Sequence, residues 1–178
     1  MSHPRPTRPA LHTRQGGVLS LPGPALIELL RAVTATGKPF RFRARGRSMS
    51  PFIREGDVIT IAPCSATSVK LGQVVAFVNP STGMLTVHRV VGIRRDACLM
   101  QGDNEGYPDG WVPRTCILGQ VTRLERNGRP VRLGMGPERI WIALLHRVGW
   151  LRPLVRQARY LLRPKLRLRR DADDHKYV

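Results

Sequence analysis

The sequence predicts a mainly antiparallel β domain flanked by helices, and three observations support this. Fifteen prolines and seventeen glycines favour a chain with many turns. Between residues 38 and 133, short apolar stretches with period-two alternation are separated by Gly, Pro and Asp turns. On both sides of this region the apolar residues recur every three or four positions, as in amphipathic helices.

The chain divides into five segments by composition and periodicity. They are a flexible tail (1–20), an amphipathic helix (21–37), a β domain (38–133), amphipathic basic helices (134–163) and a charged tail (164–178). In the first helix, Gly37 supplies a stop signal. The apolar residues at helical spacing in that helix are Leu26, Leu29, Leu30 and Val33.

Within the β domain, Phe40, Phe42 and Ala44 alternate with arginines, as expected for a half-buried strand. Further strands are predicted over residues 58–61, 73–78, 85–93, 97–101 and 117–125. The Asn127-Gly128 pair predicts a hairpin turn between residues 121–126 and 129–133.

Helical spacing returns after Gly136, and Pro153 is expected to break or restart the helix. The apolar stripe before this proline consists of Ile140, Trp141, Leu144, Leu145, Val148 and Leu151. Beyond it, leucines and Val155 lie opposite a set of arginines. This pattern suits a helix in an anionic membrane interface, but a helix that packs its stripe on the β domain is the favoured interpretation.

The chain carries a formal net charge of +18, which favours polyanionic partners such as nucleic acid or an anionic membrane surface. Ten Lys and Arg residues and no acid lie between Arg139 and Arg170. Nucleic acid is the less favoured partner, because no helix-turn-helix or aromatic RNA-binding motif is evident. The sequence does not predict an oligomeric state.

The cysteines Cys64, Cys98 and Cys116 are odd in number and widely spaced, so we expect reduced thiols in a cytoplasmic protein. No Cys or His pair has zinc-ligand spacing, so no metal is expected. The sequence contains neither the apolar run of a secretory signal nor that of a membrane span. We therefore expect a cytoplasmic protein, with peripheral attachment to the inner face of the membrane as the alternative.

Three segments carry residues for nucleophilic catalysis: 46–57 with Ser48, 87–90 with His88, and 102–109 with Asp103 and Asp109. A serine hydroxyl needs a base within hydrogen-bond reach, and imidazole can take its proton and return it. A carboxylate on the other ring nitrogen fixes the tautomer. Each residue alone also has an ordinary structural reading, as a turn serine, a core histidine or an Asx-turn aspartate.

The order and spacing of these segments resemble the signal peptidase superfamily, which includes the self-cleaving SOS-type repressors. The nucleophile box of that family, G-x-S-M-x-P…I…G-D, is matched by Gly46, Ser48, Met49, Pro51, Ile53, Gly56 and Asp57. Its next strand, its G-D-N box and its final strand are matched by residues 72–77, 102–104 and 117–121. The resemblance covers about residues 40–125 and implies a signal-peptidase-like antiparallel β domain.

The resemblance also implies the roles of the site residues. Most bacterial signal peptidases and self-cleaving repressors use a lysine base, whereas the V-H-R-V sequence at 87–90 is similar to the archaeal and endoplasmic-reticulum type with a histidine base. In that type the acid lies six residues past the Asp of the G-D-N box. This implies Ser48 as nucleophile, His88 as base and Asp109 as acid, with Asp103 as the fallback.

The oxyanion site departs from the bacterial pattern, which often has a small hydroxyl residue two positions before the nucleophile. Gly46 stands there, so the backbone N–H of Ser48 is the expected donor. Arg47 either adds positive potential or is a solvated turn residue. Together with Ser48 and Arg47, Met49 completes the predicted oxyanion and substrate-binding group.

The function implied is serine-type peptide-bond hydrolysis of a peptide or protein precursor, with no cofactor and with peripheral membrane contact through residues 139–163 as an open question. The missing N-terminal span weakens a general secretory role. Two alternatives remain. One is a catalytically retired module whose basic segments bind DNA or anionic membrane, and the other is a self-cleaving regulator with its scissile bond within residues 1–36.

Overall fold

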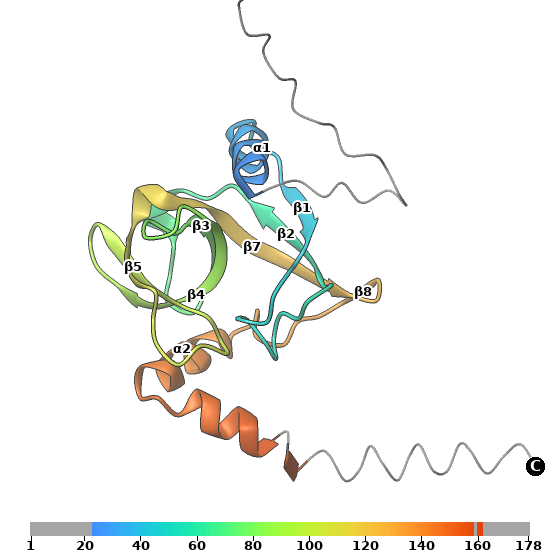
Figure 1. Ribbon diagram of the computed structural model, residues 1–178, viewed down its shortest axis with the longest axis vertical. Coiled ribbons are helices and arrows are strands. Elements are labelled where there is room, and N and C mark those ends of the chain that lie inside the picture. Colours follow the sequence, from blue (N-terminus) through green and yellow to red (C-terminus); the bar gives the residue numbers. More distant parts are fainter. Residues whose placement is uncertain (1–22, 159, 162–178) are drawn as a thin grey trace, which may run out of the picture.

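A computed structural model describes residues 23–158, 160 and 161, which form one antiparallel eight-stranded sheet with flanking helices (Figure 1). The helices are α1 (Gly23–Ala35) and α2 (Arg139–Arg147), and residues 151–158 are also helical. The mainly β fold predicted from the sequence is thereby confirmed. The two predicted tails, residues 1–20 and 164–178, lie outside the described residues.

The sheet runs in the order β1-β2-β7-β3-β4-β5-β6, with β8 paired to β7. The strands are β1 (Phe40–Arg43), β2 (Val58–Ala62), β3 (Val74–Val78), β4 (Leu85–Ile93), β5 (Ala97–Gln101), β6 (Gly110–Pro113), β7 (Ile117–Arg126) and β8 (Arg129–Pro130). Two 3₁₀ turns, η1 (Ala66–Ser68) and η2 (Arg114–Cys116), complete the domain. Among the described strands, the linear order ends at β1 and β6, and β8 pairs only with β7.

Two features of the sheet differ from the prediction. The second hairpin strand, predicted over 129–133, ends at Pro130, although the Val131 N–H still donates to the Leu124 carbonyl of β7 at 2.8 Å. The edge strand β6 was not predicted, because its four residues Gly-Trp-Val-Pro are too few to show alternation and include two turn formers.

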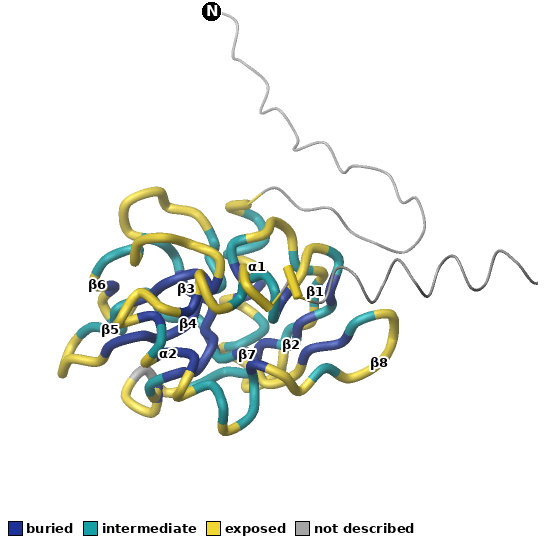
Figure 2. The backbone as a smooth tube through the Cα atoms, turned by 90° about the horizontal axis from the view of Figure 1, so that it is seen from below, coloured by how far each residue is buried: buried dark blue, intermediate teal, exposed yellow. Residues whose placement is uncertain are grey.

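The core consists of two apolar clusters that meet at the central strand β3. Val74, Val75, Ala76 and Phe77 of β3 are each at most 1% exposed, so this strand is covered on both faces. Figure 2 shows the buried backbone concentrated in the central strands and the exposed backbone in the turns. A continuous apolar run is the pattern expected of a strand buried on both sides.

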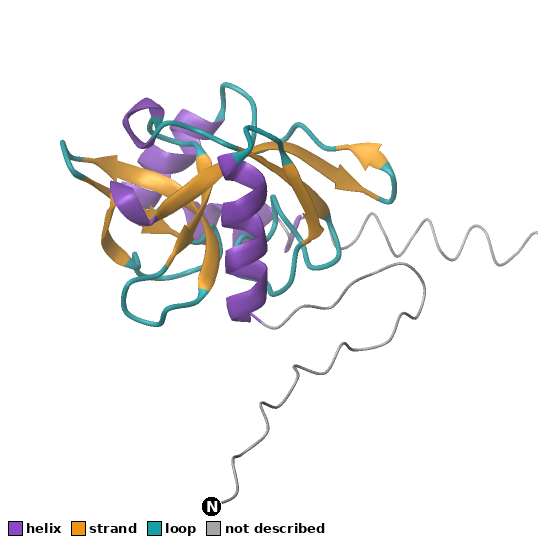
Figure 3. Ribbon diagram, turned by 90° about the horizontal axis from the view of Figure 1, so that it is seen from above, coloured by secondary structure: helices purple, strands orange, loops and turns teal. Residues whose placement is uncertain are grey.

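The two helices pack on the sheet from different sides (Figures 1 and 3). Leu30 of α1 is fully buried, and α1 contacts β1, β4 and β7. The helix α2 packs on β4 and begins against Gly72, where a Cβ would lie 2.6 Å from the Arg139 carbonyl oxygen. Only a glycine fits that approach.

A Schellman motif ends α2. Gly149, with φ of 73°, donates its N–H to the His146 carbonyl, and Trp150 donates to Leu145. The chain becomes helical again at residue 151, so Pro153 lies in the first turn of the new helix, where a proline is tolerated. No helix within the described part of the chain has the length and apolar character required to cross a bilayer.

Candidate active site

Ser48 lies in the turn that follows β1, and buried apolar neighbours hold this turn in place. The side chains of Met49 and Ile53 are 4% and 3% exposed, and the Ile53 N–H donates to the Met49 carbonyl at 3.0 Å. Gly46 begins the turn with a φ of 84°, a conformation that favours glycine. The serine hydroxyl is therefore presented from a loop anchored in the core.

Asp57 ties the end of this turn to β7. It accepts two hydrogen bonds from the Arg126 guanidinium and one from the Arg54 N–H. Burial alone would raise the pKa of Asp57, but the hydrogen bonds from Arg126 and Arg54 hold it below its ordinary value. The aspartate of the nucleophile box thus has a structural role.

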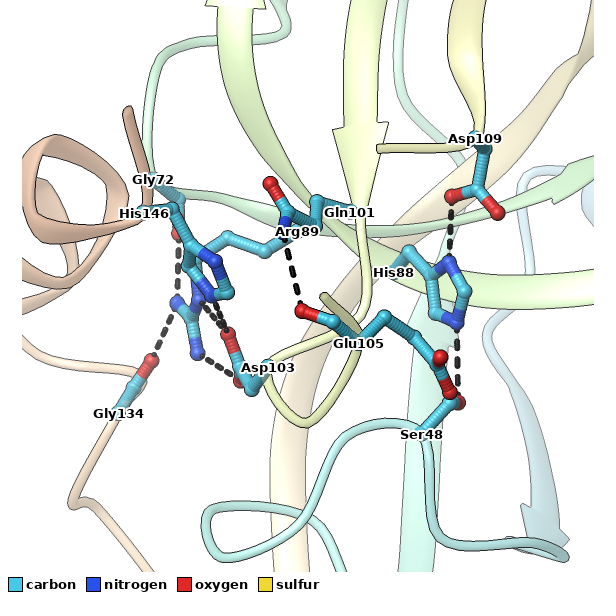
Figure 4. Close-up of polar contacts among 10 residues, drawn as sticks. All are labelled: Ser48, Gly72, His88, Arg89, Gln101, Asp103, Glu105, Asp109, Gly134 and His146. Atoms are coloured by element: carbon cyan, nitrogen blue, oxygen red, sulfur yellow. Dashed lines mark hydrogen bonds and ion pairs between the residues drawn. The ribbon is translucent and has the colours of Figure 1, made fainter. Parts of the chain in front are cut away.

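His88 lies on β4 and connects Ser48 to Asp109. Its Nε2 lies 2.9 Å from Ser48 Oγ, and its Nδ1 lies 2.6 Å from Asp109 Oδ2 (Figure 4). The imidazole is only 8% exposed and packs edge-on against Phe77, with ring centroids 6.3 Å apart. The three residues come from three separate segments and form one continuous hydrogen-bonded chain.

Asp109 takes its position from the start of β6. Its N–H donates to the Met100 carbonyl of β5 at 2.9 Å, and Gly110 follows with a φ of 101°. The carboxylate is 17% exposed, so water reaches it only from one side. Its backbone is fixed by the sheet, which leaves the side chain to orient the imidazole.

Asp103, the fallback acid, lies on the other side of β4 and binds Arg89 instead of His88 (Figure 4). Arg89 donates from Nε and Nη2 to the two carboxylate oxygens, both at 2.7 Å, and from Nη1 to the carbonyls of Gly72 and Gly134. Both side chains are fully buried. His146 of α2 also contacts Asp103, with Nε2 3.2 Å from Oδ1.

The charge of Asp103 is stable despite its burial. Desolvation alone would raise its pKa, but the hydrogen bonds and positive charge of Arg89, with His146, hold the pKa below its ordinary value. The side chain therefore anchors the G-D-N loop as a carboxylate. Arg89 and His146 were not predicted from the sequence as part of this region.

Gly102 brings the G-D-N loop directly against the nucleophile. A Cβ at this position would lie 2.8 Å from the Ser48 carbonyl oxygen and 2.9 Å from His88 Nε2. Two residues further along this loop, the Asn104 N–H donates to the same Ser48 carbonyl at 2.6 Å. The loop thus fixes the backbone of Ser48, and only glycine leaves room for the imidazole.

The predicted oxyanion and substrate-binding residues, Arg47, Ser48 and Met49, differ in how far they are exposed. Arg47 is exposed, beside the nucleophile. The Met49 side chain is packed in the core, so only the backbone of Met49 adjoins the nucleophile. Within the described residues, the backbone N–H groups of Ser48 and Met49 donate to no backbone carbonyl.

No group of three His, Cys, Asp or Glu residues in the described part of the chain could hold a metal ion. The three cysteines are free thiols. Burial raises the pKa of the Cys64 and Cys98 thiols, which disfavours their reactive thiolate form.

The sequence profile of a family described as Peptidase S24-like matches residues 20–122, more than half of the chain. This chain belongs to the Peptidase S24-like family. The match includes Ser48, His88 and Asp109, and it supports a serine peptidase-like or repressor-like protein of the superfamily to which the sequence motifs point. A search of curated proteins finds no match.

Proposed function

We propose that this member of the Peptidase S24-like family is a serine endopeptidase that cleaves a peptide or protein precursor. The observation that carries the proposal is the hydrogen-bonded chain from Ser48 Oγ through His88 to Asp109, with separations of 2.9 and 2.6 Å. Both distances lie within hydrogen-bond reach, which a nucleophile and its base require.

The proposed reaction has two halves. His88 Nε2 takes the Ser48 proton as Oγ attacks the scissile carbonyl carbon, and it then gives that proton to the leaving amine. The C–N bond breaks and a Ser48 ester forms. Water next gives a proton to His88 and attacks the ester, and the proton returns to Ser48 Oγ as the acid product leaves. Asp109 holds the Nδ1–H tautomer and stabilises the imidazolium.

We assign the oxyanion position to the backbone N–H of Ser48, because Gly46 offers no side-chain hydroxyl two residues earlier. The Asn104 N–H supports this geometry by binding the Ser48 carbonyl. Arg47 adds positive potential from its exposed position beside the nucleophile.

We further propose that the enzyme belongs to the histidine-base type of signal peptidase. The V-H-R-V sequence of residues 87–90 and the six-residue step from Asp103 to Asp109 support this assignment. Under this proposal Asp103 is a structural anchor, in agreement with its two hydrogen bonds from Arg89.

The substrate in this proposal is an extended peptide with small residues at the scissile bond, bound by strand addition. Two sheet edges adjoin the site. The edge strand β6 begins directly after Asp109, and the edge strand β1 leads to Ser48 five residues after its end. Cleavage of the chain by itself would need a scissile bond outside α1, because α1 is helical and packs through the fully buried Leu30.

A fluorophosphonate probe tests the nucleophile without knowledge of the substrate. Wild type should acquire one phosphonyl group on Ser48, located by mass spectrometry of its peptides. Ser48→Ala should not be labelled there, and His88→Ala and Asp109→Asn should be labelled more slowly. Ser81→Ala, which removes an exposed hydroxyl from the β3–β4 turn, is the matched control and should react like wild type.

The same proteins should then be incubated with a diverse peptide pool and, separately, alone at raised pH. Products formed by wild type and Ser81→Ala but not by Ser48→Ala would identify the preferred bonds. A shortened chain in the second incubation would favour the self-cleaving regulator. Absence of both Ser48 labelling and cleavage would overturn the peptidase and favour the retired binding module.

A further inference from the structure

The outer face of α2 and the helix after it form a surface that the proposed peptidase reaction does not use. We propose that this surface docks the protein on an anionic lipid bilayer. The outer face of α2 is defined by Ile140, Trp141, Leu144 and Val148. The inference concerns binding and does not depend on the proposed catalysis.

The side of α2 that faces the sheet is already occupied. Ile142, Ala143 and His146 are buried, and α2 contacts β4. At about 100° per residue, the four residues of the outer face span an arc of roughly 100° on the opposite side. Most of the predicted stripe thus lies on the outward side, and the buried residues of α2 are ones that the stripe did not include.

The outer face is apolar although it is exposed. Ile140, Trp141, Leu144 and Val148 are 45%, 70%, 37% and 62% exposed. A surface helix ordinarily turns polar residues outward and its single apolar stripe toward the core. Four neighbouring apolar side chains on the outward side therefore indicate a surface that is covered by something else.

The next helical segment extends this apolar surface along the chain. Trp150, Leu154 and Leu161 are 65%, 45% and 63% exposed, and their spacing of four and seven places them on one side of a helix. Both helical segments lie at the same end of the molecule, away from α1 (Figure 1). Two exposed tryptophans in this region match the preference of indole for the membrane–water boundary.

Charge identifies an anionic bilayer as the occupant. Residues 139–161 contain five arginines and no acidic residue. Arg147 is exposed at the border of the outer face, and within the described residues no carboxylate forms an ion pair with it. Arg152 and Arg156 are also exposed, but they line the cavity beside Asp103 and not the apolar side of their helix. A second copy would bring the same basic segments together, and nucleic acid would leave the aliphatic side chains without a partner. An anionic bilayer offers negative headgroups to the arginines and an apolar interior to the aliphatic and aromatic side chains.

Docking at this surface would leave α2 between the bilayer and β4, the strand that carries His88. The segment after α2 borders a cavity of about 1070 Å³ whose lining includes Asp103, Asn104, Arg152 and Arg156. On the inner side, His146 contacts Asp103 in the loop that reaches Ser48. Where the proposed peptidase function also holds, its substrate would be cut near the membrane surface.

Vesicle co-sedimentation with the full chain tests the docking. Vesicles of phosphatidylcholine with an equal amount of phosphatidylglycerol should bind the protein, and pure phosphatidylcholine should bind it far less. Trp141→Ser should weaken binding to the anionic vesicles by about tenfold or more, because it removes the largest side chain from the outer face. Met84→Ser is the matched control, since Met84 is 65% exposed on the β3–β4 turn.

Tryptophan fluorescence adds an independent readout. A variant that keeps only Trp141 (Trp111→Phe, Trp150→Phe) should shift to shorter wavelength with anionic vesicles. A variant that keeps only Trp111 (Trp141→Phe, Trp150→Phe) should not shift, because Trp111 lies on β6 and stacks with Arg94. The proposal is overturned by absence of binding, by equal binding of Trp141→Ser and wild type, or by a face that only joins two copies of the chain.

Discussion

Removal of the Arg89 guanidinium tests the anchor beneath the candidate active site. Arg89→Met leaves the Asp103 carboxylate fully buried with only His146 as a side-chain partner, and it also releases the carbonyls of Gly72 and Gly134. Loss of one partner from a buried ion pair costs about 3–5 kcal/mol. At roughly 2–4 °C per kcal/mol for a chain of this size, the melting temperature should fall by about 6–20 °C.

The assay is urea unfolding at neutral pH followed by circular dichroism, with Arg123→Met as the control. Arg123 also binds a carboxylate, that of Glu125, but its side chain is 64% exposed, so its loss should cost at most about 1 kcal/mol. The double variant Arg89→Met/Asp103→Leu should be more stable than Arg89→Met by at least about 1 kcal/mol, because no lone charge remains. The reasoning is refuted if Arg89→Met costs no more than the control, or if the double variant is the less stable.

Three further predictions concern the loop and the buried groups. Gly102→Ala should fold but lose most Ser48 labelling by the fluorophosphonate probe, because its Cβ would meet His88 Nε2 at 2.9 Å; wild-type labelling would contradict this. The folded-state pKa of Asp103 is lowered, so its stabilising effect is present above the unfolded value of about 3.9 and is lost as the pH falls through the folded value. Urea midpoints should therefore fall on acidification below about pH 4, less steeply in Asp103→Asn, and an equal slope would argue against it. Cys98 is fully buried and burial raises its thiol pKa, so it should react with a thiol reagent only on unfolding; rapid modification of the native protein would count against this.

Local periodicity predicted most of the sheet because the strands alternate or are uniformly apolar. The strands over 85–93 and 97–101 have those bounds in the structure. Alternation could not reveal β6, since four residues with a terminal Gly and Pro do not establish a period. Nor could it give the order of strands, which places β7 between β2 and β3.

The three residues of the candidate triad were predictable from the sequence, but the buried residues that hold the neighbouring loop in place were not. Residue types suggested Ser48 and His88, and the family resemblance favoured Asp109 over Asp103. An arginine beside apolar residues gives no local sign of burial, so the complete burial of Arg89 depends on contacts with distant segments. His146 likewise sits at helical spacing from apolar residues, and its contact with Asp103 spans 43 positions.

The prediction of Met49 as an oxyanion or substrate-binding residue stays a prediction, because burial of its side chain does not test a role for its backbone N–H. Its place beside the nucleophile suggested contact with substrate, but successive residues in a tight turn point in different directions. The side chain is 4% exposed and belongs to the same cluster as Leu30 of α1. The position of Met49 next to Ser48 in the sequence therefore predicts that both residues lie in one turn, but it does not predict which side chain faces outward.

Neighbouring residues of β4 hold one loop from opposite faces of the sheet, His88 through Asp109 and Arg89 through Asp103. The five residues between the two aspartates form a span of fixed length across the strand. An inserted or deleted residue in that span would move one aspartate away from its partner while the other stayed bound. The length of this loop should therefore tolerate change as poorly as the three residues of the candidate triad, even though most of the loop is exposed.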